Sequence, residues 1–227
     1  MELKSEPLDS LLKGGVEHGV ITNFYGTSGT GKTNICVQAA ASCIQEGGRA
    51  LFIDTEGGFS TERFVQIYGD EEGLENLVLT EPTTFEEQKE LFKKLEEKTD
   101  QENIDLVIVD SLVSLYRIEL QEEAPETNRE LSKQLSVLSK IARKKDLPII
   151  VTNQVYSSFE TDEVKMVGKD VPTYWSKCLV KLETKKHSIR KAVLKKHRSR
   201  PEGIHERFVI KDKGIFKPDK KREEEIL

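Results

Sequence analysis

One short segment constrains the fold more than any other feature of this sequence. The pattern G-x-x-x-x-G-K-[ST] is matched at every fixed position by Gly26, Thr27, Ser28, Gly29, Thr30, Gly31, Lys32 and Thr33. An apolar segment, 20–25, precedes it, and a segment with helical character, 33–45, follows it. A glycine-rich loop in that setting turns backbone N–H groups toward phosphate oxygens, and the helix N-terminus adds positive partial charge. The segment therefore predicts an α/β fold with a phosphate-binding loop, or P-loop.

A second motif supports a nucleotide site. Four apolar residues, 106–109, predict a strand buried on both faces, and Asp110 ends it. Ligands of open α/β sheets bind at the carboxyl ends of the strands. We therefore expect Lys32 to reach the β- and γ-phosphates of ATP, and Thr33 and Asp110 to hold Mg²⁺. An aspartate at a strand end is also an ordinary turn residue, so this interpretation depends on its pairing with the P-loop.

The rest of the chain alternates in the same style. Apolar strand segments (50–54, 77–80, 106–109 and 149–152) alternate with helical patterns (61–67, 85–98 and 130–145). This order predicts a mostly parallel central sheet flanked by helices. Later segments (178–183, 189–196 and 207–210) are separated by short polar turns and predict an antiparallel extension. We expect one domain over 1–227, with a lead-in at 1–19, a hairpin extension at 178–216 and a charged tail at 220–227.

Composition excludes several classes of protein. The net charge is −5, so any contact with nucleic acid must come from a local basic patch. Cys36, Cys43 and Cys178 give neither a disulfide framework nor a zinc pattern, as expected for a cytoplasmic protein with reduced thiols. The first residues lack the apolar core of a signal peptide. No apolar run approaches the roughly 20 residues that span a bilayer, so no membrane partner is expected.

Hydrolysis of ATP also needs a group that orients water. Glu56 follows the strand segment 50–54 at the same end of the sheet, and is the candidate for general base or water positioner. A glutamate in a solvent-exposed loop is the plain alternative, and the spacing leaves both open.

Three segments resemble one family. Residues 52–64 (FIDTEGGFSTERF), 152–155 (TNQV) and the lead-in around 7–17 are similar to elements of the archaeal and eukaryotic RecA-type recombinases. The resemblance covers nearly the whole chain. It implies a RecA-like P-loop ATPase core and a role in DNA repair and homologous recombination, with a recombinase or another repair protein as partner.

The resemblance also implies roles for individual residues. Glu56 would be the catalytic glutamate, acting with Lys32. Gln154 would sense the γ-phosphate and pass its state to the following loop. Arg63 would stack on adenine, a use that suits a planar guanidinium. The alternatives are a strand-end glutamine and a surface arginine.

Within the family, the chain resembles a short archaeal branch. Only 19 residues precede the first predicted strand, and the segment 194–203 is similar to a basic stretch in the proteins of that branch. No room is left for the linker through which full-length recombinases polymerise, so a homo-oligomer is expected to form no long filaments. The first DNA-loop region, 117–127, is acidic, with Glu119, Glu122, Glu123 and Glu126, and the second, 156–171, is mixed. Tight wrapping of DNA by these loops is not expected.

The strongest local basic patch spans 185–200, with eight Lys or Arg and no acidic residue. It would bind DNA without sequence specificity through phosphate contacts, or reach the γ-phosphate of a neighbouring subunit. Lys196-His197-Arg198 is similar to the K-x-R finger of KaiC-like proteins and hexameric helicases. A third interpretation is a solvated edge strand. We favour the DNA interpretation and expect His197 to be a polar surface residue. The residues that would make either contact are Lys195, Lys196, Arg198 and Arg200.

These features predict an accessory recombination ATPase with weak turnover, whether or not DNA stimulates it. One alternative is a non-enzymatic, nucleotide-switched adaptor for a recombinase or nuclease. Another is a KaiC-like signalling ATPase, which the segment 52–64 disfavours.

Overall fold

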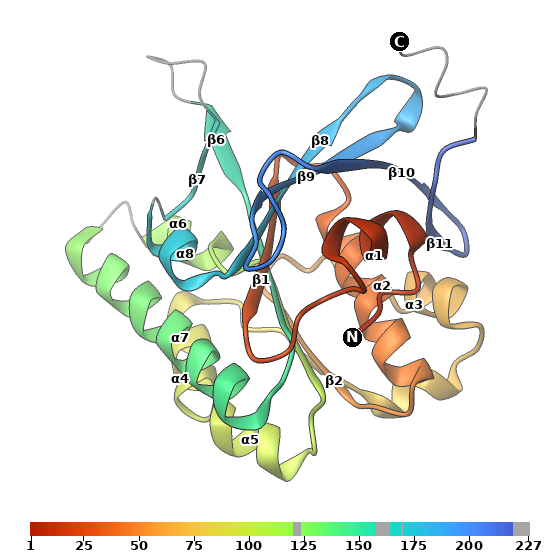
Figure 1. Ribbon diagram of the computed structural model, residues 1–227. Helices are drawn as coiled ribbons and strands as arrows, with labels where there is room; N and C mark the ends of the chain where they lie inside the picture. The colour runs from red at the N-terminus through yellow and green to blue at the C-terminus, as the bar shows by residue number, and fades with distance from the viewer. Residues whose placement is uncertain (120–123, 158–163, 169, 220–227) are drawn as a thin grey trace.

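A nine-stranded sheet runs through the molecule (Figure 1). The computed structural model describes residues 1–119, 124–157, 164–168 and 170–219. The order across the sheet is β11-β10-β9-β8-β1-β5-β4-β2-β3. In chain order its strands are β1 (Ile21–Gly26), β2 (Ala50–Asp54), β3 (Leu77–Thr80), β4 (Leu106–Asp110), β5 (Ile149–Asn153), β8 (Cys178–Thr184), β9 (Arg190–Lys196), β10 (His205–Lys211) and β11 (Gly214–Phe216).

Helices cover both faces of this sheet (Figure 1). One face carries α1 (Glu6–Leu12), α2 (Lys32–Gln45) and α3 (Thr61–Tyr68). The other face carries α4 (Phe85–Lys93), α5 (Leu95–Gln101) and α7 (Ala124–Lys145). The predicted α/β architecture, with a mostly parallel central sheet between layers of helices, is confirmed.

The central strands are buried on both faces. In β2, Phe52 belongs to the apolar cluster under α2, whereas Leu51 and Ile53 belong to the cluster under α7. This is the alternation that a pleated strand imposes. All four apolar residues of 106–109 are fully buried, as the continuous apolar run predicts.

Parallel pairing brings the carboxyl ends of four neighbouring strands together. β1 pairs with β5, β5 with β4, and β4 with β2, all in parallel. The P-loop follows β1, and the residues after β5, β4 and β2 meet it at the same edge. This register positions the site.

The C-terminal strands differ from the prediction in one respect. β8 runs parallel to β1 and antiparallel to β9, so it continues the parallel sheet as well as starting the extension. The antiparallel pairings are β8 with β9, β9 with β10 and β10 with β11.

Several short elements were not predicted. A separate hairpin follows β5 and consists of β6 (Val155–Ser157) and β7 (Val164–Met166), projecting from the body of the molecule in Figure 1. Two short helices, α6 (Ser114–Glu119) and α8 (Asp170–Trp175), precede α7 and β8. The pattern over 85–98 forms two helices instead of one, with the break at Lys94. Of the residues noted in the predicted DNA loops, Glu122 and Glu123 lie outside the described residues, as does the tail 220–227.

The lead-in 1–19 is part of the core. Leu3, Leu8 and Leu11 are fully buried in the cluster that contains α2. The carboxylate of Asp9 accepts hydrogen bonds from the backbone N–H groups of Leu3 (2.7 Å) and Ser5 (2.9 Å), which fixes the turn before α1. Among the described residues, no helix is both long and apolar enough to cross a membrane.

Candidate nucleotide-binding site

The P-loop fits tightly between β1 and the strands beside it. A Cβ atom at Gly26 would lie 2.5 Å from the carbonyl oxygen of Leu182 in β8, so only glycine allows this approach. Gly31 has φ +100° where it caps the N-terminus of α2, a conformation that glycine adopts without strain. These two glycines therefore fix the conformation of the loop that leads into α2.

Lys32 lies inside this loop. Its Nζ donates to the carbonyl oxygens of Gly26 and Thr27, each at 3.0 Å, and the Thr30 hydroxyl donates to the same Thr27 oxygen at 2.8 Å. Burial lowers the pKa of Lys32, and the negative charges of Glu56 and Asp110 oppose that shift. An ammonium held inside a glycine-rich loop is suited to bind a polyphosphate.

Asp110 has the environment of a metal ligand. Its Oδ1 accepts a hydrogen bond from the Thr152 hydroxyl, and the Thr33 side chain lies close enough to lower its pKa. Its Oδ2 is buried and has no hydrogen-bond partner among the described residues. Burial raises the pKa of Asp110, although both hydroxyl contacts lower it. A buried carboxylate oxygen without a partner, close to a threonine hydroxyl, fits the oxygen donors that Mg²⁺ prefers.

Glu56 is positioned by its own loop. The buried Asp54 accepts hydrogen bonds from the backbone N–H groups of Glu56 (3.0 Å) and Phe59 (2.7 Å). Thr55 ties the loop to the end of β4, since its hydroxyl donates to the Ser111 carbonyl at 2.6 Å and accepts from the Ser111 N–H at 3.0 Å. Sequence reasoning missed Asp54, although its place at the end of an apolar strand, like that of Asp110, was a usable signal.

Gln154 connects two elements. Its Nε2 donates to Glu56 Oε1 at 2.8 Å, and its Oε1 accepts from Arg117 Nη1 at 3.0 Å. Arg117 lies on α6, at the start of the predicted first DNA loop. The structure thus brings the predicted Glu56 and Gln154 together and adds Arg117, which no sequence spacing connected to them.

Arg63 lies beside the P-loop helix. Its Nε donates to Asn34 Oδ1 at 2.8 Å, and its Nη atoms donate to the carbonyl oxygens of Asp212 (2.7 Å) and Lys211 (2.9 Å). The edge of the guanidinium is thus used to hold the β10–β11 turn. Stacking on adenine, which would use its flat face, stays a prediction.

A cavity of about 230 Å³ lies at this junction. It is lined by Ser28, Gly29, Gly31, Lys32, Thr33, Asn34, Glu56, Gln154, Arg190 and Ile210. Gly26, Thr27 and Thr30 do not line the cavity. The carbonyl oxygens of Gly26 and Thr27 accept from Lys32, and the Thr30 hydroxyl donates to the Thr27 oxygen. Asn34 follows the P-loop motif directly, but nothing in the sequence linked Arg190 or Ile210 to it.

The C-terminal end of the basic segment 185–200 lies away from the P-loop of the same chain. Arg190 and Lys196 stand at opposite ends of β9, six residues apart, which at about 3.3 Å per residue separates them by about 20 Å. Lys195 pairs with Glu202 at 2.8 Å, and Arg198 pairs with Glu17 at 3.4 Å. The Arg198 side chain is 53% exposed, so it is available to an external partner.

Two other residues of the segment hold helices. Lys196 Nζ donates to the carbonyl oxygen of Thr173 in α8 at 2.9 Å. Arg200 Nη1 donates to the carbonyl oxygens of Ser10 and Leu11, at the C-terminal end of α1. A cation there satisfies carbonyl groups that the helix leaves unpaired.

The expectation that His197 is a surface residue was wrong. Its side chain is 1% exposed, because it packs beside Glu17, and its Nδ1 accepts from the Ser199 N–H at 3.1 Å. Burial lowers the pKa of His197, and this shift is opposed by Glu17. The imidazole is therefore a buried packing group with little net charge at neutral pH.

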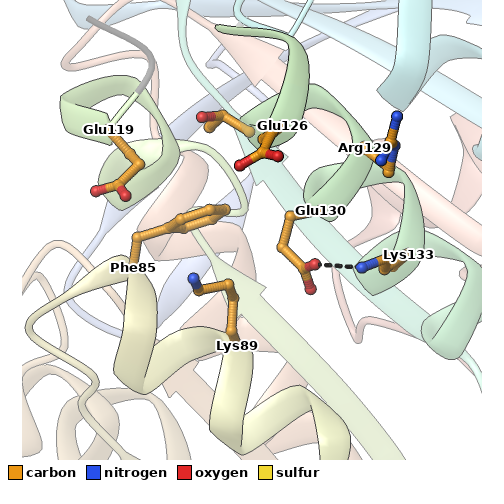
Figure 2. A pocket seen from close by; sticks show the side chains of 8 residues that line it. Phe85, Lys89, Glu119, Glu126, Arg129, Glu130 and Lys133 are labelled. Carbon is orange, nitrogen blue, oxygen red and sulfur yellow. Dashed lines mark hydrogen bonds and ion pairs between the residues drawn. The ribbon is translucent and has the colours of Figure 1, made fainter. Parts of the chain in front are cut away.

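A second cavity, of about 240 Å³, lies between α4, α6 and α7 (Figure 2). It is lined by Phe85, Lys89, Glu119, Glu126, Thr127, Arg129, Glu130 and Lys133. Figure 2 shows the carboxylates of Glu119 and Glu126 and the ammonium of Lys89 around the Phe85 ring. This cavity has no glycine-rich backbone, and the part of the chain that the structure describes contains no cluster of His, Cys, Asp or Glu able to hold a metal ion.

Comparison with known proteins agrees with this geometry. The model of the Rad51 family matches residues 1–218. The DNA repair and recombination protein RadB of Methanococcoides burtonii is 42% identical over 214 residues, covering 92% of this chain and 94% of that protein. The RadB protein of Methanococcus maripaludis (strain C7) is 45% identical over 213 residues, covering 92% and 96%.

A solved structure gives the same result. A crystal structure described as that of the RadB recombinase superposes with a TM-score of 0.85 at 38% identity, covering 96% of this chain and 99% of that one. The fold is therefore the RecA-like recombinase fold, and its relatives are similar over almost their full length. This chain belongs to the Rad51 family.

Proposed function

We propose that this protein binds Mg·ATP in the P-loop cavity and acts as an accessory ATPase with weak turnover in DNA repair and homologous recombination. One observation carries the proposal. Lys32, Glu56 and Gln154, which follow three adjacent parallel strands, line one cavity. The charge of the buried Asp110, at the end of the fourth strand, acts on Lys32. The curated relatives named above are DNA repair and recombination proteins, which supports the cellular role.

The proposed mechanism divides the work among these side chains. Lys32 and the P-loop N–H groups would bind the phosphate chain, and Arg63 would stack on the base. Thr33 and Asp110 would hold Mg²⁺, which supplies charge neutralisation when bound. Glu56 would orient a water molecule and accept its proton, giving ADP and phosphate. Gln154, hydrogen-bonded to Glu56, would respond to the γ-phosphate.

DNA is the proposed macromolecular ligand, bound without sequence specificity. Lys195 and Arg198 are exposed, and each pairs with one carboxylate, the exposed Glu202 and the partly buried Glu17, which DNA phosphates could replace. Lys196 and Arg200 belong to the same patch and would orient it, since their donors are used by α8 and α1. In the alternative, the exposed Arg198 side chain would reach the nucleotide of a neighbouring subunit.

A nucleotide-switched adaptor is the second candidate. The hydrogen-bonded series from Glu56 through Gln154 to Arg117 joins the catalytic edge to α6, and β6 begins directly after Gln154. Such a link could transmit nucleotide binding to a partner recombinase or repair protein without rapid hydrolysis. In either case we propose a cytoplasmic protein whose homo-oligomers form no long filaments.

The test is the ATPase rate measured against protein concentration, with and without DNA, together with sizing of the protein at each concentration. Lys32→Ala should abolish nucleotide binding and hydrolysis because it removes the buried ammonium from the loop. Unchanged ATP affinity of that variant would refute the P-loop assignment. Binding without hydrolysis at any concentration would favour the adaptor.

A further inference from the structure

Arg190, the first residue of β9, lies directly against the P-loop. Its Nε donates to the carbonyl oxygen of Gly29 at 3.3 Å, and its Nη1 donates to the carbonyl oxygen of Ser188 at 3.0 Å. Its side chain also lines the nucleotide cavity, together with Lys32. Arg190 thus faces the phosphate-binding loop from a strand that follows it by more than 150 residues.

Ile210 of β10 lines the same side of the cavity as Arg190. A Cβ atom at Gly31 would lie 3.0 Å from Ile210 Cδ1 and 3.4 Å from Arg190 Cδ. The two C-terminal strands therefore pack on the outer side of the loop, and the cavity lies between them and the catalytic edge that carries Glu56. One wall residue is cationic and the other is apolar.

Among the residues that the structure describes, Arg190 has no acidic partner. Nearby cations of the extension are paired, since Lys185 contacts Glu183 at 2.8 Å and Lys195 contacts Glu202 at 2.8 Å. For Arg190, within the described ranges, burial lowers the pKa of the guanidinium and no acidic group opposes it. A partly buried cation is expected to have an anionic partner. The anion that this cavity is built to receive is a phosphate.

We propose that Arg190 is a phosphate-binding residue of the nucleotide site, supplied by the same chain, and that Ile210 forms an apolar wall for the ribose or base. The inference rests on the proposed function, because it assumes that a nucleotide occupies this cavity. It gives the C-terminal extension a direct part in nucleotide binding, separate from any contact with DNA at its far end.

The test compares Arg190→Gln with Lys191→Gln. Both remove one positive charge, but successive side chains of a strand point to opposite faces, so only Arg190 faces the loop. Calorimetric titration with ATP, ADP and inorganic tripolyphosphate should show affinity reduced by roughly 10- to 100-fold for Arg190→Gln, as expected for loss of a charge-assisted hydrogen bond. Lys191→Gln should stay within about twofold of the wild type, since a surface charge contributes little.

Two further measurements separate a phosphate contact from loop packing. The affinity difference between Arg190→Gln and the wild type should shrink as salt rises, because ions screen a direct charge contact. Ile210→Ala should weaken ATP but leave tripolyphosphate unchanged. Arg190→Lys keeps the charge and should recover part of the affinity, which guards against misfolding of the Gln variant.

The inference fails if Arg190→Gln binds all three ligands as Lys191→Gln does, or if its defect is independent of salt. That result is distinguishable from failure of the proposed function. If Lys32→Ala binds ATP normally, the P-loop assignment itself is wrong. If Lys32→Ala loses ATP binding but Arg190→Gln keeps it, only the role of Arg190 is overturned.

Discussion

Replacing Glu56 by glutamine tests the proposed chemistry with little change in shape. The backbone N–H of Glu56 is held by Asp54, and this bond does not involve the side chain. Glu56 Oε1 accepts a hydrogen bond from Gln154 at 2.8 Å, and an amide oxygen can accept the same bond. The substitution therefore keeps the loop and its contact with Gln154 while removing the group that accepts a proton.

The expected magnitude follows from these contacts. A general base contributes roughly 10²–10⁴-fold in rate. At about 1.36 kcal/mol per tenfold, this corresponds to roughly 3–5 kcal/mol of barrier. Lys32 and the P-loop are untouched in Glu56→Gln, so the affinity for Mg·ATP should stay within about threefold of the wild type, less than the 1.4 kcal/mol that a tenfold change requires.

The assay is single-turnover release of phosphate at saturating ATP, with calorimetry for nucleotide affinity. Asp110→Asn is the control, since Asp110 Oδ2 is the buried oxygen without a partner. It should raise the Mg²⁺ concentration needed for half-maximal hydrolysis instead of removing the catalytic base. Turnover of Glu56→Gln equal to that of the wild type would refute the assignment of Glu56, and reduced ATP affinity would point to a binding role.

Three other perturbations have separable outcomes. Arg198→Ala should lower the salt slope of DNA affinity by about one unit with little effect on turnover; a large loss of ATPase with unchanged DNA binding would instead favour contact with a neighbouring subunit. Arg200→Ala should lower the free energy of unfolding by about 1–2 kcal/mol in urea, because carbonyl groups at the end of α1 lose a charged donor; a change below about 0.5 kcal/mol would be that of an ordinary surface position. Burial raises the pKa of the Cys43 and Cys178 thiols to about 12, so at pH 8 both stay protonated and iodoacetamide should label them only after denaturation; rapid labelling of the native protein would contradict this burial.

Local patterns determined much of this molecule. The P-loop, Asp110 at the end of its buried strand, and each alternating strand or helix can be recognised from residues that are neighbours in the sequence. Each follows from backbone geometry or from burial of a continuous apolar run, so the fold class and the core of the site could be predicted. Glu56 and Gln154 became specific only through the resemblance to a family, because an acidic loop residue and a strand-end glutamine have no distinctive local pattern.

Pairings between distant segments could not be predicted in this way. Arg190 meets Gly29 because β8 lies beside β1 and β9 lies beside β8, and no spacing in the sequence encodes that order. The same holds for Arg200, which was expected to contact DNA or a neighbouring subunit and is held at the end of α1.

His197 shows the limit most directly. Its neighbours in the sequence are charged, yet its side chain is buried next to Glu17, a residue far away in the chain. The sequence by itself determined which segments form strands, helices and the phosphate-binding loop, because those depend on neighbours along the chain. Only the tertiary structure decided which side chains surround that loop, because register and strand order are set by packing across the whole sheet.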